Sequence, residues 1–180
     1  MFDKLGIYQT RFWLKEESLK KIGKSSSGFL LELFSRVDAL VDQDLVYYDH
    51  QMDMETCFEK YSFHEFKWHQ TPNGDMEWVF MLNRQGYLVD LAVAFYITKE
   101  EKYLKKWKEI VFDFILENDE ETSHPEASWR VLDAGIRLMN WVKSLTYLPL
   151  SEFSEVESKF KKRFPCMLII FVLIYKKSIF

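Results

Sequence analysis

The chain has 180 residues, 48% of them hydrophobic and 17% aromatic, which suits one folded domain and excludes a largely disordered protein. Its formal net charge of −4 implies no basic face, so nucleic acid is not an expected partner. The 6 glycines and 4 prolines are few, which favours long helices over a turn-rich β-sandwich.

The first half of the chain predicts two helices and a long connection. Residues 11–22 have helical character, and the sequence at 25–28, three serines and a glycine, interrupts it. From Phe29 to Val46 the apolar residues recur at i, i+3, i+4 and i+7, which predicts an amphipathic helix. Residues 47–72 are rich in aromatic residues and lack a sustained period, which predicts a long connection with short extended pieces.

The centre of the chain predicts a pair of helices. A turn signal at residues 73–74 precedes Asp75, whose side chain is suited to capping a helix. We expect this helix to span 75–97 and to pass through Gly86 at a modest energetic cost. Since a short turn follows, the helix predicted over 99–117 forms an antiparallel hairpin with it, the unit of bundles, solenoids and α/α toroids.

Two capping signals mark the helices of the second half. Thr98 and Glu101 have the spacing of a capping box at the start of the helix at 99–117. After an acidic loop, Ser128 is the expected cap of a helix that runs to about Tyr147. The apolar residues expected to line the core side of that helix are Leu132, Ile136, Met139 and Leu145.

Helices joined by short turns, without a convincing run of strands, predict an all-α fold. A further short helix is expected over 152–164. No fixed-period repeat is visible, which makes a tetratricopeptide-type solenoid the weaker alternative. The expected organisation is one helical domain over residues 1–164, followed by an apolar tail at 165–180.

That tail contains ten consecutive apolar residues, 166–175, between basic residues. At about 1.5 Å per residue they span about half of a ~30 Å hydrocarbon core, which disfavours a transmembrane helix and a membrane partner. The alternatives are a buried helix or strand, an aberrant tail, or a membrane anchor. The N-terminus lacks the pattern of a secretory signal, so the expected location is cytoplasmic.

Cysteine and histidine spacing suggests no metal site. Cys57 and Cys166 are far apart and match no ligand spacing, so two thiols are expected rather than a disulfide. His64 and His69 flank Trp68, but no cysteine or second acidic residue completes a ligand set. We therefore expect no metal and no cofactor.

Two stretches resemble a known family. NGDMEWVFMLNRQGYLVDLAVAFYITKEEKYLKKWKEIVFDFI and SWRVLDAGIRLMNW are similar to the N-terminal helical region of heparinase II/III-like polysaccharide lyases, over about residues 60–165. The motifs that carry the resemblance are Asp-x-Glu-Trp at 75–78, Leu-Asn-Arg at 82–84, Trp-Arg at 129–130, Ala-Gly-Ile-Arg at 134–137 and Asn-Trp at 140–141. The resemblance implies antiparallel helical hairpins that form part of an incomplete α/α toroid.

The resemblance also implies a reaction. Such enzymes cleave uronate-containing polysaccharides, of the heparan sulfate or alginate type, by β-elimination. The C5 carboxylate must be neutralised, the C5 proton abstracted and the departing oxygen protonated. In the family an Asn polarises the carboxylate and a Tyr and a His serve as acid and base, further along than the part that this chain matches. We therefore expect no catalytic residue in this chain and interpret it as a truncated fragment that is inactive alone. The expected partner is an acidic polysaccharide or oligosaccharide.

Five residues are candidates for binding that saccharide. Arg130 and Arg137 are seven residues apart, so one helix face can carry both guanidiniums and hold a carboxylate or sulfate; ion pairing with Asp133 is the alternative. The candidates are Asn83, Arg84, Trp129, Arg130 and Arg137.

For the other candidates too, an ordinary structural role is the alternative. For Asn83 and Arg84 the alternatives are lining a cleft and bonding the 47–72 connection. For Trp129 they are stacking on a sugar and packing in the core. Core positions are expected for Trp78, Trp107 and Trp141. A different kind of function, a non-catalytic helical module that binds a partner protein, is the rival hypothesis.

Overall fold

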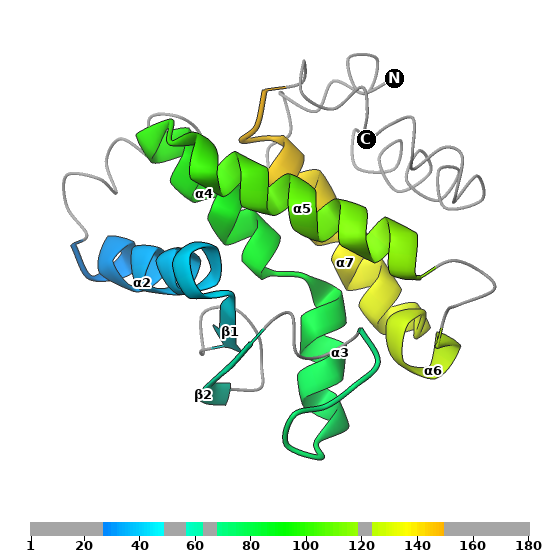
Figure 1. Cartoon of the computed structure of the whole chain (residues 1–180). Coiled ribbons are helices and arrows are strands. Elements are labelled where there is room, and N and C mark those ends of the chain that lie inside the picture. The colour runs from blue at the N-terminus through cyan, green and yellow to red at the C-terminus, as the bar shows by residue number, and fades with distance from the viewer. Residues whose placement is uncertain (1–26, 49–56, 63–67, 119–123, 150–180) are drawn as a thin grey trace.

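The computed structural model describes residues 27–48, 57–62, 68–118 and 124–149. These residues form helices and one two-stranded sheet (Figure 1), so the fold is all-α as predicted. The elements are α2 (Ser27–Gln43), β1 (Leu45–Tyr48), β2 (Cys57–Ser62), α3 (Met76–Arg84), α4 (Tyr87–Thr98), α5 (Glu101–Glu117), α6 (Pro125–Ser128) and α7 (Val131–Leu145). Whether the hairpins belong to an α/α toroid stays a prediction.

Helix α2 lies slightly earlier in the chain than predicted. It begins at Ser27, inside the expected break, and ends at Gln43 rather than at Val46. Asp44 follows with a φ of 54°, a left-handed conformation that ends a helix. Val46 instead lies in β1, opposite Tyr61 of the antiparallel strand β2. Most of the short antiparallel pair β1 and β2 therefore lies within residues 47–72, which were predicted as a connection.

The prediction of one continuous helix over 75–97 is wrong. Asp75 does cap α3 as predicted, because its carboxylate accepts the N–H of Glu77 at 2.9 Å. Gln85 then adopts a φ of 55°, and its own N–H bonds the carbonyl of Leu82, which closes α3. A new helix, α4, begins at Tyr87 and runs in a different direction (Figure 1).

Helices α4 and α5 form the predicted antiparallel hairpin (Figure 1). The predicted capping box is wrong, however. Thr98 belongs to the end of α4, where its hydroxyl donates to the carbonyl of Ala94 and accepts the N–H of Glu100. Glu100 is the N-terminal cap position of α5 and makes no side-chain capping bond.

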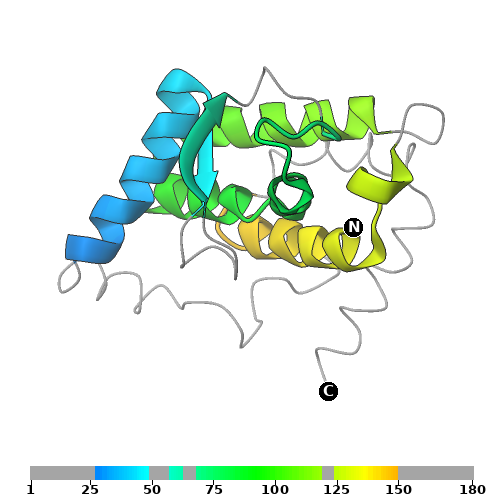
Figure 2. The same cartoon turned by 90° about the horizontal axis from the view of Figure 1, so that it is seen from below.

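The core lies around α4, which packs against α2, α5 and α7. Viewed from below, α5 and α7 lie on opposite sides of α3 and α4 (Figure 2). Trp78, Trp107 and Trp141 are buried, as predicted. Within the described ranges, no helix is long and apolar enough to cross a membrane.

Helix α7 buries a different face from the predicted one. Leu132 and Met139 are exposed and Ile136 is half-buried, so of the predicted apolar face Leu145 alone is buried. The buried residues of α7 are Asp133, Arg137, Leu138, Asn140, Trp141, Ser144 and Leu145. The side of α7 that faces the core is therefore largely polar.

The start of α7 also differs from the prediction. Ser128 is the last residue of the separate four-residue helix α6, and Arg130 occupies the cap position of α7 without a side-chain capping bond. The predicted helices at 11–22 and 152–164, the tail at 165–180 and Cys166 lie outside the described residues.

Candidate functional site

The five predicted binding residues come together where the end of α3 meets the start of α7. Asn83 and Arg84 end α3, Trp129 and Arg130 connect α6 to α7, and Arg137 lies two turns into α7. Asp133 of α7 completes the group. We call these six residues, with Glu77 of α3, the α3–α7 cluster.

Arg137 is the central brace of the cluster. Its Nη1 donates to the carbonyl of Asn83 and its Nη2 to the carbonyl of Ser128, both at 2.8 Å. Its guanidinium lies 4.3 Å from the ring centroid of Phe114 and 4.9 Å from that of Trp129. Because the side chain is 1% exposed, it fastens α7 to α3 and α6 rather than reaching the surface.

Burial sets the protonation of Arg137. Desolvation lowers the pKa of its guanidinium to about 9, while Tyr87 and the carboxylate of Asp133 act in the opposite direction. The group therefore remains a cation at neutral pH, and the two carbonyl oxygens accept charge-assisted hydrogen bonds.

The polar side of α7 caps the end of α3. The last carbonyls of a helix lack partners within it and carry the negative end of the helix dipole. Arg137 bonds the carbonyl of Asn83, and Nδ2 of Asn140 bonds the carbonyl of Arg84 at 2.8 Å. This need explains why α7 turns polar residues inward and leaves Leu132 and Met139 exposed.

Asn83 is fully buried and serves the 47–72 connection. Its Nδ2 donates to the carbonyl of Trp68 at 2.6 Å and to that of Val79 at 2.9 Å. The first bond is the structural alternative considered from the sequence. Its Oδ1 is buried and has no hydrogen-bond partner among the described residues.

A buried carboxylate holds two arginines. Nε of Arg84 donates to Oδ1 of Asp133 at 2.7 Å, and Nε of Arg130 lies 2.9 Å from Oδ2 as an ion pair without hydrogen-bond alignment. Glu77 lies 3.8 Å from Nη2 of Arg84. Arg84 is thus buried and held by an aligned hydrogen bond to Asp133, whereas Arg130 is held more loosely.

Arg130 and Trp129 are the two predicted residues that reach the surface. The side chain of Arg130 is 36% exposed, and its guanidinium lies 3.8 Å from the ring centroid of Phe80. Its Nη groups donate no hydrogen bond to the residues that the structure describes. Trp129 is half-buried, and its ring centroid lies 5.7 Å from that of Phe114, with the two ring planes at 62°.

Phe80 was missed from the sequence. It precedes Arg84 by four residues, a spacing that places both on one face of α3. That spacing was a usable signal, although nothing in the sequence indicated that Arg130, fifty residues later, would lie over the ring.

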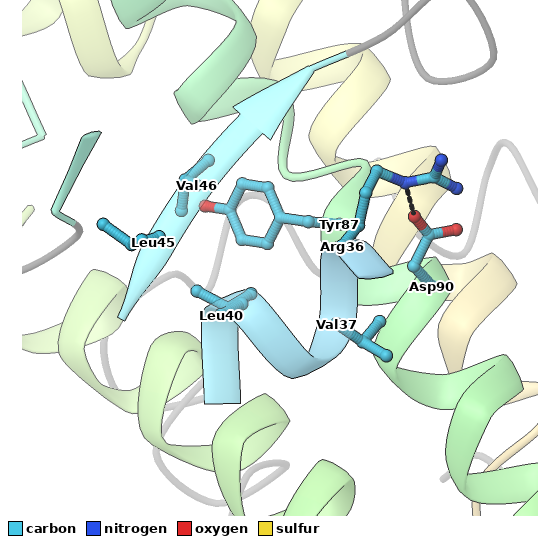
Figure 3. A pocket seen from close by; sticks show the side chains of 7 residues that line it. All are labelled: Arg36, Val37, Leu40, Leu45, Val46, Tyr87 and Asp90. Atoms are coloured by element: carbon cyan, nitrogen blue, oxygen red, sulfur yellow. Dashed lines mark hydrogen bonds and ion pairs between the residues drawn. The ribbon is translucent and has the colours of Figure 1, made fainter. Parts of the chain in front are cut away.

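A separate small pocket lies between α2, β1 and α4 (Figure 3). Arg36 and Asp90 line it and pair with each other at 2.8 Å. The hydroxyl of Tyr87 donates to the carbonyl of Leu82, and burial raises its pKa well above the usual value. Since the other walls are apolar, this pocket is a weaker candidate than the α3–α7 cluster.

The histidines provide a further contact near α6. The rings of His69 and His124 stack with 3.6 Å between centroids, and Nδ1 of His124 lies 3.2 Å from Oε1 of Glu126. In the residues that the structure describes, no three His, Cys, Asp or Glu side chains gather as a metal site. His64 lies outside the described residues.

A family model described as Heparinase II/III N-terminus matches residues 17–165, a span that contains the whole α3–α7 cluster. No curated protein and no solved structure matches the chain.

Proposed function

The chain belongs to the heparinase II/III N-terminus family, and we propose that it is the helical region of a polysaccharide lyase that binds an acidic polysaccharide at the α3–α7 cluster. Trp129 and Arg130 contact the saccharide, and Asn83, Arg84 and Arg137 hold them in place. The polysaccharide contains uronate, of the heparan sulfate or alginate type, and the whole enzyme cleaves it by β-elimination.

The partly exposed side chain of Arg130 is the observation that carries this proposal. Its planar end, whose two Nη groups donate no hydrogen bond to the described residues, matches the two oxygens of a carboxylate. The ring of Phe80 lies beneath that plane and restricts its orientation. Trp129, half-buried and next to Arg130 in the chain, is the aromatic ring against which we expect the C–H groups of a sugar ring to pack.

The described cluster supports one part of β-elimination. A cation beside the uronate carboxylate stabilises the negative charge that develops when the C5 proton leaves. The tyrosine beside the cluster, Tyr87, donates to a backbone carbonyl, and burial raises its pKa, so it is a poor proton acceptor at neutral pH. We therefore propose that these residues bind the saccharide and transfer no proton.

Titration of acidic oligosaccharides into the full chain tests this function. Oligosaccharides of alginate and of heparan sulfate, with a neutral oligosaccharide of equal length as control, are followed by tryptophan fluorescence and calorimetry. Arg130→Ala should weaken binding about tenfold, the effect of one lost charge-assisted contact of ~1.4 kcal/mol. Lys105→Ala removes an exposed cation from α5 and should leave binding unchanged.

Two results would overturn the proposal. Equal affinity for the neutral and the acidic oligosaccharides would exclude the anion contact at Arg130. Growth of the ultraviolet absorbance of an unsaturated uronate product would show proton transfer by this chain and exclude a purely binding role.

A protein-binding module is the second candidate function. Val131, Leu132 and Met139 of α7 are exposed to 88%, 57% and 46%, and exposed apolar groups of this size favour a protein partner. Size-exclusion chromatography with light scattering separates the two: a monomer with affinity for acidic oligosaccharides favours the first function. Self-association that Leu132→Lys abolishes, without such affinity, favours the second.

A further inference from the structure

We propose that Asp133 and Glu77 determine the specificity of the α3–α7 cluster, because they cancel two of its three guanidinium charges and so select isolated carboxylates over dense sulfate. This inference rests on the proposed function. It predicts that the bound saccharide has a low charge density. The cluster then binds a single carboxylate of the saccharide rather than several sulfates.

The charge balance of the cluster is the first observation. Asp133 is fully buried, 2.7 Å from Nε of Arg84 and 2.9 Å from Nε of Arg130. Glu77 lies 3.8 Å from Nη2 of the same guanidinium of Arg84. Together with Arg137, three guanidiniums face two carboxylates within the described cluster. One net positive charge remains, which matches the charge of one uronate.

The placement of the remaining charge is the second observation. Arg137 is buried and donates both Nη groups to backbone carbonyls, and Arg84 is held by Asp133. In the described cluster, Arg130 is therefore the guanidinium that is partly exposed and that donates no hydrogen bond to a described residue. A site that holds several sulfates needs several such groups, because each sulfate needs donors of its own.

Asp133 also opposes additional charge on the ligand. An anion bound at the Nη end of Arg130 lies across the same guanidinium from Oδ2 of Asp133. Charges near a protein surface interact several times more strongly than charges in bulk water. The repulsion grows with each negative group on the saccharide, so a sulfated chain is penalised more than a chain with one carboxylate per repeat.

The test compares two oligosaccharides of equal length that both alternate uronate and glucosamine, unsulfated N-acetylheparosan and heparin, on the full chain. The wild-type protein should bind the unsulfated chain at least as tightly as the sulfated one. Glu77→Gln and Asp133→Asn should each shift the ratio of dissociation constants toward heparin, by roughly three- to tenfold at low salt. Glu101→Gln removes an exposed carboxylate from the start of α5 and should leave the ratio unchanged.

Glu77→Gln is the decisive variant. Its side chain is 44% exposed and its contact with Arg84 is long, so the variant is expected to fold even where Asp133→Asn does not. An unchanged ratio in Glu77→Gln, or a wild-type preference for heparin, overturns this inference. Failure of the wild-type protein to bind either oligosaccharide instead overturns the proposed function.

Discussion

Nη1 of Arg137 donates a 2.8 Å hydrogen bond to the backbone carbonyl of Asn83, fifty-four residues earlier in the chain. The bond joins a helix end that lacks internal partners to a buried cation that needs acceptors. It therefore satisfies both groups, and it fixes the position of α7 against α3. The surface residues Trp129 and Arg130 precede α7 directly, so their position depends on this contact.

Removal of the Arg137 guanidinium should destabilise the fold. Arg137→Met keeps most of the apolar stem but leaves the carbonyls of Asn83 and Ser128 buried without their donors. Hydrogen bonds to charged groups contribute about 1.5–3 kcal/mol each, so we expect a loss of about 3 kcal/mol or more in the free energy of unfolding. Denaturant unfolding followed by tryptophan fluorescence measures it.

Arg130→Met is the matched control for that measurement. Arg130 is partly exposed and its ion pair with Asp133 lacks alignment, so its removal should cost less than about 1 kcal/mol. Equal costs for the two variants would show that Arg137 is not the brace of the cluster.

Asn83→Asp should be far more damaging than its small size suggests. The amide nitrogen of Asn83 donates to the carbonyls of Trp68 and Val79, and a carboxylate at that position would face both oxygens without a proton to offer. Burying an uncompensated charge and leaving two carbonyls unpaired should cost about 3 kcal/mol or more. Thermal melting followed by circular dichroism measures the loss.

Asn73→Asp makes the same isosteric change where it should be harmless. The side-chain oxygen of Asn73 accepts hydrogen bonds from Thr71 and from the N–H of Asp75, and a carboxylate retains both. If the two variants melted at the same temperature, the role assigned to the Asn83 amide would be wrong.

The apolar pattern was sufficient for the fold class and for most helix positions, but not for the helix ends. The break at Gln85 depends on its left-handed backbone and on its bond to Trp141, a residue fifty-six positions away. No local pattern predicts such a contact, and Gly86 looked like the more permissive residue. Thr98 likewise bonds the end of its own helix because α4 extends one residue further than predicted.

The buried face of α7 was mispredicted for a related reason. Periodicity assigns apolar residues to the core, and Leu132 and Met139 have the correct spacing. The structure instead buries Asp133 and Arg137, because α3 ends beside them and its carbonyls need donors. The motifs did identify five residues that lie in one cluster in the structure. The sequence could not tell which of the five are buried.

Helix α3 should depend on the cap at Asp75. The carboxylate accepts the N–H of Glu77, one of the unpaired donors at the helix start, so Asp75→Ala should lower the free energy of unfolding by about 1 kcal/mol. Asp75→Asn retains an acceptor in the same place and should cost much less. Urea unfolding of the two variants provides the comparison, and equal losses would show that charge, not capping geometry, is responsible.

Alkaline pH should destabilise the protein through Tyr103. Its hydroxyl, buried on α5, donates to Oδ1 of Asp38 on α2 at 2.8 Å, and burial together with this bond raises its pKa to about 12. In the unfolded chain the pKa of a tyrosine is near 10, so the unfolded chain loses this proton at a lower pH than the folded chain does. The contribution of Tyr103 to the free energy of unfolding is therefore complete below about pH 10 and is lost as the pH approaches 12.

Tyr103→Phe should be less stable than the wild-type protein by about 1 kcal/mol at pH 8, because it lacks the bond to Asp38. Its stability should then fall less steeply above pH 10, so that the two curves converge. Parallel curves from pH 8 to pH 12, measured by urea unfolding, would contradict a raised pKa at Tyr103.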